Sequence, residues 1–135
     1  MNHLIRRAVT VPAATALLLL TAGAASGSPA GAVHHAGSCR GAGDYATCVA
    51  SGTAYNPRTI AVHVTSSPGQ GVQVYWDMVC SKGDGAGSKS GHFTARTPLR
   101  RTLRHPYVRP DSCDVSADAQ LATGGRLHVW ITYRH

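Results

Sequence analysis

Apolar and polar residues alternate in short stretches along most of the chain after residue 44. The clearest stretch places Ile60, Val62 and Val64 on one face, with small or polar residues between them. A period of two residues indicates β-strands with one buried face, and turn residues separate the stretches. We therefore predict seven strands, at 45–54, 58–67, 71–80, 92–96, 99–105, 113–121 and 127–133, with a glycine-rich loop over 81–91.

Seven short strands spaced by about ten residues, with no convincing helix after residue 38, predict an all-β fold. Trp76 and Cys80 share the inward face of the third strand, and Cys113 opens the sixth. This arrangement resembles the core of an immunoglobulin-like β-sandwich, although Asp111 stands where such domains carry a tyrosine. We predict an immunoglobulin-like β-sandwich of about seven antiparallel strands, in which the third, sixth and seventh strands lie side by side.

The start of the chain has the pattern of an export signal. Arg6 and Arg7 precede an apolar run from Ala8 to Ala25 that has no charged flank of the stop-transfer kind. We predict a signal peptide at 1–25, with cleavage as late as residue 32, a flexible Gly/Ala/Ser-rich tail at 26–38 and the β-sandwich at 39–135. The protein would then be secreted, with no membrane segment in its mature form.

Four cysteines follow the predicted signal peptide, namely Cys39, Cys48, Cys80 and Cys113. An even number of cysteines in a small exported domain indicates disulfides. Three pairings are possible, and proximity along the chain favours 39–48 and 80–113, which would contribute about 2.5 and 4 kcal/mol. No Cys-x-x-Cys or His-x-His spacing points to a metal site, so we expect neither a metal nor a cofactor.

The chain is basic, with a formal net charge of +7 and six acidic residues, all of them aspartates. No acidic residue occurs from Gly85 to Pro110, whereas basic residues are frequent there. Such a basic ridge would attract an extracellular polyanion; alternatively, it is a solvated surface that blunts an edge strand. The arginines of the predicted ridge are Arg96, Arg100, Arg101, Arg104 and Arg109.

A second candidate surface comes from the outward faces of the predicted third, sixth and seventh strands. Side by side, these faces would bring Tyr75 and Trp130 together among amides and carboxylates. Exposed aromatic side chains in such surroundings suit stacking on sugars or burial in a protein interface. Alternatively, Trp130 packs on Tyr75 or on the stem of Arg134 and binds nothing.

Catalytic patterns are weak in this chain. The glycine-rich stretch 83–90 has Ser88 where a phosphate-binding loop needs its second glycine, and no Gly-x-Ser-x-Gly motif occurs. With the cysteines paired and no glutamate present, we expect no catalytic residue and no enzyme activity.

The last third of the chain carries a pattern that begins with Pro110-Asp111-Ser112-Cys113 and runs to Gly124-Gly125-Arg126-Leu127. Together with the signal peptide and the four cysteines, it resembles uncharacterised small secreted proteins of GC-rich Gram-positive bacteria. The resemblance implies export. It assigns no activity and no functional residues.

These observations favour a secreted, non-enzymatic binding protein whose partner is an extracellular polyanion, a cell-wall polymer or another secreted protein. One alternative is an inhibitor of secreted proteases, acting through Asp111-Ser112 or the loop around Lys82. A further alternative is a small hydrolase that uses aspartate and histidine.

Overall fold

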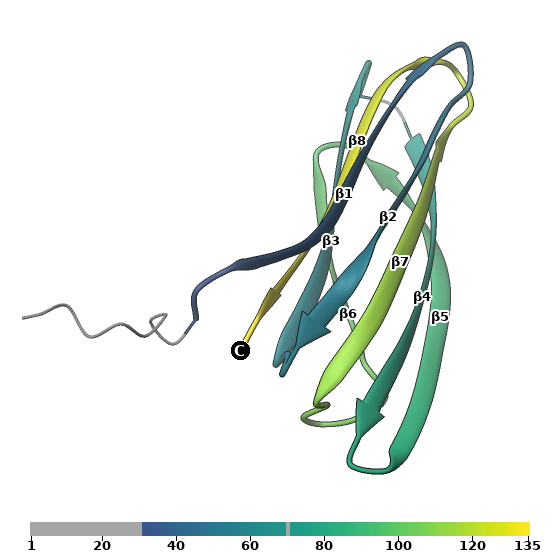
Figure 1. The fold of residues 1–135 in the computed structure, drawn as a ribbon. Helices are drawn as coiled ribbons and strands as arrows, with labels where there is room; N and C mark the ends of the chain where they lie inside the picture. The colour runs from purple at the N-terminus through teal and green to yellow at the C-terminus, as the bar shows by residue number, and fades with distance from the viewer. Residues whose placement is uncertain (1–30, 70) are drawn as a thin grey trace, which may run out of the picture.

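A computed structural model of the chain describes residues 31–69 and 71–135. The predicted signal peptide lies outside these residues, which contain no helix able to cross a membrane. The chain forms two four-stranded antiparallel sheets packed as a sandwich (Figure 1). The strands are β1 (His34–Gly43), β2 (Ala46–Tyr55), β3 (Thr59–Ser67), β4 (Gly71–Lys82), β5 (Gly85–Arg96), β6 (Leu99–Leu103), β7 (Ser112–Leu121) and β8 (Gly125–Arg134).

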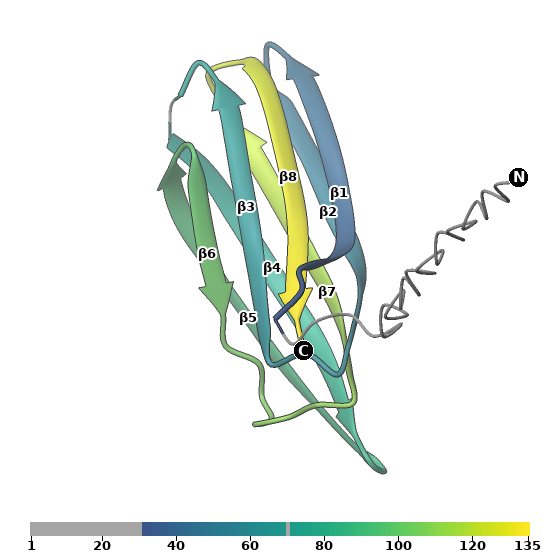
Figure 2. The ribbon, with the colours of Figure 1, turned by 90° about the vertical axis from the view of Figure 1, so that its left-hand side faces the viewer.

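The strand order is β1-β8-β3-β6 in one sheet and β2-β7-β4-β5 in the other, and Figure 2 shows the first sheet in front of the second. Strands pair as 1 with 8, 2 with 7, 3 with 6 and 4 with 5, which is the order of an eight-stranded jelly roll. The immunoglobulin-like order that we expected is not the order found. Alternation reveals which residues face the core, but it does not reveal which strands become neighbours.

The core lies between the two sheets and consists of the predicted inward faces. Ile60, Val62 and Val64 are fully buried, and the inward residues of β7 and β8 are buried as well. Each aliphatic side chain of this kind stabilises the fold by about 1.5–3 kcal/mol. Trp76 differs from the expectation, because it is only partly buried at the margin of the core.

Two stretches adopt strand structure that the pattern does not predict. Residues 34–38, expected in the flexible tail, form the first half of β1, and residues 85–91, expected in a loop, belong to β5. Both strands lie at sheet edges, are rich in glycine and are largely exposed. Main-chain hydrogen bonds with β8 and β4 therefore hold these two strands in place. Apolar and polar side chains alternate little along them.

The edge formed by β1 and β2 is closed. The disulfide Cys39–Cys48 joins β1 to β2, and so links the two sheets. Main chain packs directly on main chain here: a Cβ added to Gly52 would lie 1.8 Å from the Ala36 carbonyl oxygen. Only glycine permits this approach.

The second disulfide, Cys80–Cys113, joins directly opposed residues of β4 and β7. Both favoured pairings are thus confirmed, but this bridge lies within one sheet, whereas the immunoglobulin bridge connects two sheets. Two disulfides in a domain of this size are typical of proteins that fold in an oxidising compartment.

Candidate functional site

The outer face of the sheet β1-β8-β3-β6 gathers basic and aromatic side chains from strands that are far apart in sequence. Arg40, His128 and Thr65 are register neighbours on β1, β8 and β3. One row further along, His63 of β3 lies between its neighbours on β8 and β6. We call this surface the basic face, and define it by Arg40, His63, Arg100, Arg126, His128 and Trp130.

Acidic residues are absent from the basic face. Asp77, Asp114 and Asp118 point outward from the other sheet, since they alternate there with buried residues. The remaining aspartates, at positions 44, 84 and 111, lie between strands. Within the sheet, the exposed arginines of the basic face therefore have neutral or basic neighbours, which gives this surface an excess of positive charge. Asp44 lies in the turn that follows β1.

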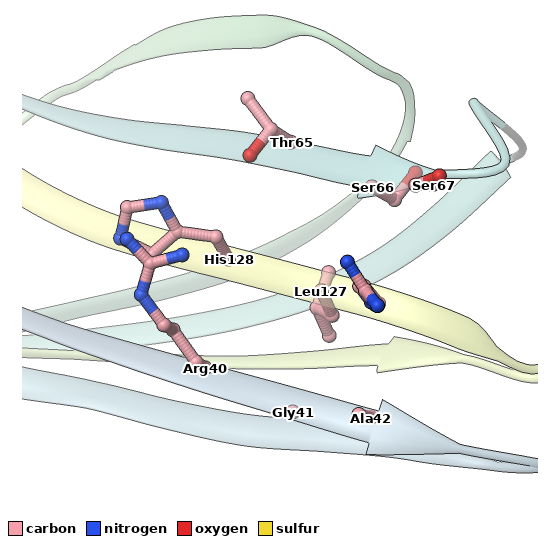
Figure 3. Close-up of a pocket in the computed structure, with 9 residues that line it drawn as sticks. Arg40, Gly41, Ala42, Thr65, Ser66, Ser67, Leu127 and His128 are labelled. Atoms are coloured by element: carbon pink, nitrogen blue, oxygen red, sulfur yellow. The ribbon is translucent and has the colours of Figure 1, made fainter.

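A cleft of about 430 Å³ opens on the basic face, between β1, β8 and β3. Figure 3 shows the Arg40 guanidinium beside the His128 ring, with Thr65, Ser66 and Ser67 on the opposite wall. The hydroxyl of Ser66 is held by hydrogen bonds with the Pro68 carbonyl, at 2.9 Å, and with the Thr97 hydroxyl, at 2.6 Å. The hydrogen of the Ser66 hydroxyl is thus already donated to Pro68. Guanidinium groups together with the hydroxyls of Thr65 and Ser67 around one cleft suit the oxygens of a phosphate or sulfate group.

Trp130 forms the centre of an aromatic stack next to this cleft. The His63 ring lies parallel to the indole with centroids 4.9 Å apart, and the His128 ring stacks on it at 4.6 Å. His63 Nε2 also shares a hydrogen bond of 2.8 Å with the Thr132 hydroxyl. The neighbours that hold Trp130 are therefore two imidazoles, and neither of them was predicted.

Both histidines of the stack have a lowered pKa. Burial lowers the pKa of His63 most, and the charges of Arg100 and His35 lower it further. Burial also lowers the pKa of His128, with a smaller contribution from Arg40. An anion bound beside these arginines would offset their repulsion and stabilise the protonated imidazoles.

The predicted basic ridge is not one surface. Arg100 points outward opposite His63, whereas Arg101 lies on the other side of β6, exposed at the open edge toward β5, with its guanidinium carbon 4.7 Å from the centroid of the Phe93 ring. Consecutive strand residues face opposite sides, so the two arginines are separated. Arg96 extends outward from the other sheet, and Arg104 and Arg109 follow β6 in the connection to β7.

The predicted pair of aromatic residues is also divided. Tyr75 lies on the outer face of β4, with the expected polar residues of β7 beside it. Trp130 is on the opposite outer face of the sandwich, because β8 pairs with β1 and β3. The third and sixth predicted strands, which are β4 and β7, are neighbours as expected. The expectation that the seventh, β8, lies beside them is wrong.

Four residues of the basic face were not among the predicted site residues, namely Arg40, His63, Arg126 and His128. Arg126 and His128 alternate with Trp130 along β8, so the period of two could have revealed them. Arg40 lies in β1, which the alternation does not predict. Its place beside His128 follows only from the register of β1 on β8.

The hydrogen bonds of the histidines and the shape of the loop around Lys82 do not favour the two alternative functions. In the described ranges, the histidine hydrogen bonds go to a hydroxyl or to main-chain oxygens, and none goes to a carboxylate. The loop around Lys82 is a tight turn that closes the β4–β5 pair, whereas a protease cleft binds an extended segment. No group of three potential metal ligands occurs among the residues described.

Comparison of the chain with protein-family models, with curated proteins and with solved structures finds no match. The chain is therefore described by its fold and its candidate site alone. It is a jelly-roll β-sandwich, stapled by two disulfides, with one basic outer face.

Proposed function

We propose that the protein is a secreted, non-enzymatic binding protein whose basic face holds an extracellular polyanion, such as a phosphate-bearing polymer of the cell wall. One observation carries this proposal: Arg40 and Arg126 line a single cleft beside His128, on a face that has no carboxylate. The two disulfides and the predicted signal peptide support a location outside the cytoplasm.

The extent of the basic face favours a polymer over a single small anion. Its arginines come from three strands, β1, β8 and β6, which are the first, second and fourth strands of the sheet. Three spacings between strands amount to roughly 14 Å, which is longer than one phosphate group. A chain of phosphate groups could therefore contact the Arg40–Arg126 cleft and Arg100 at the same time.

Reversing the charge of the cleft tests this proposal. We expect the double variant Arg40→Glu, Arg126→Glu to bind long-chain inorganic polyphosphate at least about tenfold more weakly than the wild type, because it loses two cations at the contact. Isothermal titration calorimetry in low salt measures the two affinities. The matched control is Arg96→Glu combined with Arg109→Glu, which changes the net charge equally but away from the basic face. Equal weakening by both double variants would mean that only the net charge matters.

The lowered pKa values of His63 and His128 predict how binding depends on pH. In the free protein both histidines protonate below their ordinary pKa of 6.5. A bound polyanion raises these pKa values, so binding takes up protons, and the affinity for polyphosphate increases as the pH falls from 7.5 to 5.5. The variant His63→Gln, His128→Gln should lose most of this dependence. A pH profile that is identical in wild type and variant would contradict a role for these histidines.

A further inference from the structure

The side of the sandwich opposite the disulfide-linked edge is open. There β5 and β6 are the outermost strands of their sheets, and they do not pair with each other. A cleft of about 370 Å³ lies between them. A neighbouring cleft of about 340 Å³ shares Lys89, Leu103 and Arg104 with it and continues to Tyr107. We call the two clefts together the edge groove.

The edge groove combines an apolar floor with positive charge. Trp76 rests against Gly91, where a Cβ would come within 2.9 Å of the indole, and Leu103 is buried beneath. The Arg101 guanidinium lies over the Phe93 ring, a cation–π arrangement that leaves it without a carboxylate partner among the residues described. Lys89 and Arg104 add two further cations to the lining.

The main chain of β5 is unpaired along the groove. β5 extends over twelve residues and pairs with β4 on one side only; no described residue pairs with its other edge. The strand contains no proline, and the charges on it, at Lys89 and Arg96, are positive. Such charges oppose addition of a neutral or basic strand, but they attract an acidic one. Between Gly87 and Phe93 the free edge is roughly 20 Å long, enough for a peptide of six to seven residues.

We propose that the edge groove binds an extended acidic peptide segment of another protein, which adds to the free edge of β5 as a further strand. Main-chain hydrogen bonds to β5 would supply affinity, and alternate side chains would supply specificity. Acidic side chains of the peptide would meet Lys89, Arg101 and Arg104. The stems of these side chains would pack on Trp76 and Phe93, because Lys89 and Phe93 face the groove together. The alternate, apolar side chains of the peptide would lie on the outer face of the sheet.

Charge and chemistry favour an acidic peptide over the other occupants of this groove. A second copy would bring the lysine and arginines of one groove against those of the other, and like charges repel. Residues 1–30 of the chain contain no acidic residue, so they do not complement the groove. An anionic polysaccharide could neutralise the charge, but it has no backbone amides and carbonyls with which to pair β5.

A designed peptide tests the proposal. The probe is a fluorescein-labelled nonapeptide of alternating glutamate and valine, and its binding is followed by fluorescence anisotropy. We expect Arg101→Glu combined with Arg104→Glu to weaken binding at least about tenfold, because two attractive charges become repulsive. Arg100→Glu combined with Arg126→Glu is the matched control: it changes the net charge equally but on the basic face, so binding should change by less than about twofold.

Two further peptides distinguish strand addition from attraction by charge alone. They are N-methylated on alternate amides, one at the glutamates and the other at the valines. Because only every second residue of an added strand donates to its neighbour, one methylated peptide should lose binding and the other should keep it. Circular dichroism checks that the variants fold. If the double variant does not fold, Arg104→Glu alone replaces it in the binding experiment, because Arg104 is exposed and lies outside β6.

Three results would overturn the proposal. One is that the folded Arg101→Glu, Arg104→Glu variant binds the peptide with the affinity of the wild type. If only the single variant folds, the same result in Arg104→Glu counts. Another is equal binding of both methylated peptides. The third is loss of peptide binding in Arg40→Glu, Arg126→Glu, which would place the peptide on the basic face.

Discussion

We expect the replacement of Cys80 and Cys113 together by alanine to lower the free energy of unfolding by about 4 kcal/mol. The two residues are 33 positions apart, and in the unfolded chain their bond restricts a loop that contains all of β5 and β6. A typical domain has about 5–15 kcal/mol of stability in total, so this loss is a large fraction of it. Urea unfolding of the purified variant, followed by circular dichroism, measures the change.

The Cys39–Cys48 pair provides the comparison. These residues are only 9 positions apart, so the same substitution there should cost about 2.5 kcal/mol. The larger loss therefore belongs to the bridge within one sheet, and the smaller to the bridge that links the sheets. If removal of Cys39–Cys48 costs more, direct linkage of the two sheets contributes more than chain entropy does.

A methyl group at Gly52 should destabilise the fold by about 3 kcal/mol, at the upper end of the range for overpacking. The atoms that it meets belong to the main chain of Ala36, which cannot rotate away as a side chain does. Gly52→Ala must therefore push β1 away from β2, next to the disulfide that joins them. Chemical unfolding of the variant measures the cost.

Gly71→Ala is the matched control for this substitution. A methyl group there meets only the Thr94 side chain, at an ordinary contact distance of 3.5 Å. Its effect should be within about 0.5 kcal/mol of zero, as for most surface substitutions. Equal losses in the two variants would show that β1 and β2 have room to separate, and that their close packing adds little stability.

Alternation along the chain was enough to predict the strands that have one buried face. β3, β4, β7 and β8 each carry a regular row of apolar residues, and the predicted rows are the core. β1 and the first half of β5 could not be predicted, because their glycines and exposed polar residues follow no period. Their structure depends on main-chain pairing with β8 and β4, which leaves no pattern in the side chains.

The candidate site was predictable only in part, for a related reason. Trp130 was recognised as an aromatic residue on an outward face, and Arg100 as an outward cation. Their common surface depends on the pairing of β3 with both β6 and β8, which alternation does not reveal. The basic ridge was read from residues close together in sequence, and strand geometry then placed Arg100 and Arg101 on opposite faces.

The salt dependence of polyphosphate binding tests the basic face most directly. Each cation that contacts the polymer releases about one counterion, so the slope of log affinity against log salt counts the contacts. We predict that Arg40→Glu, Arg126→Glu reduces the magnitude of this slope by about 2, whereas Arg96→Glu, Arg109→Glu leaves it unchanged. Equal slopes in the wild type and both variants would contradict the assignment of polyanion binding to this face.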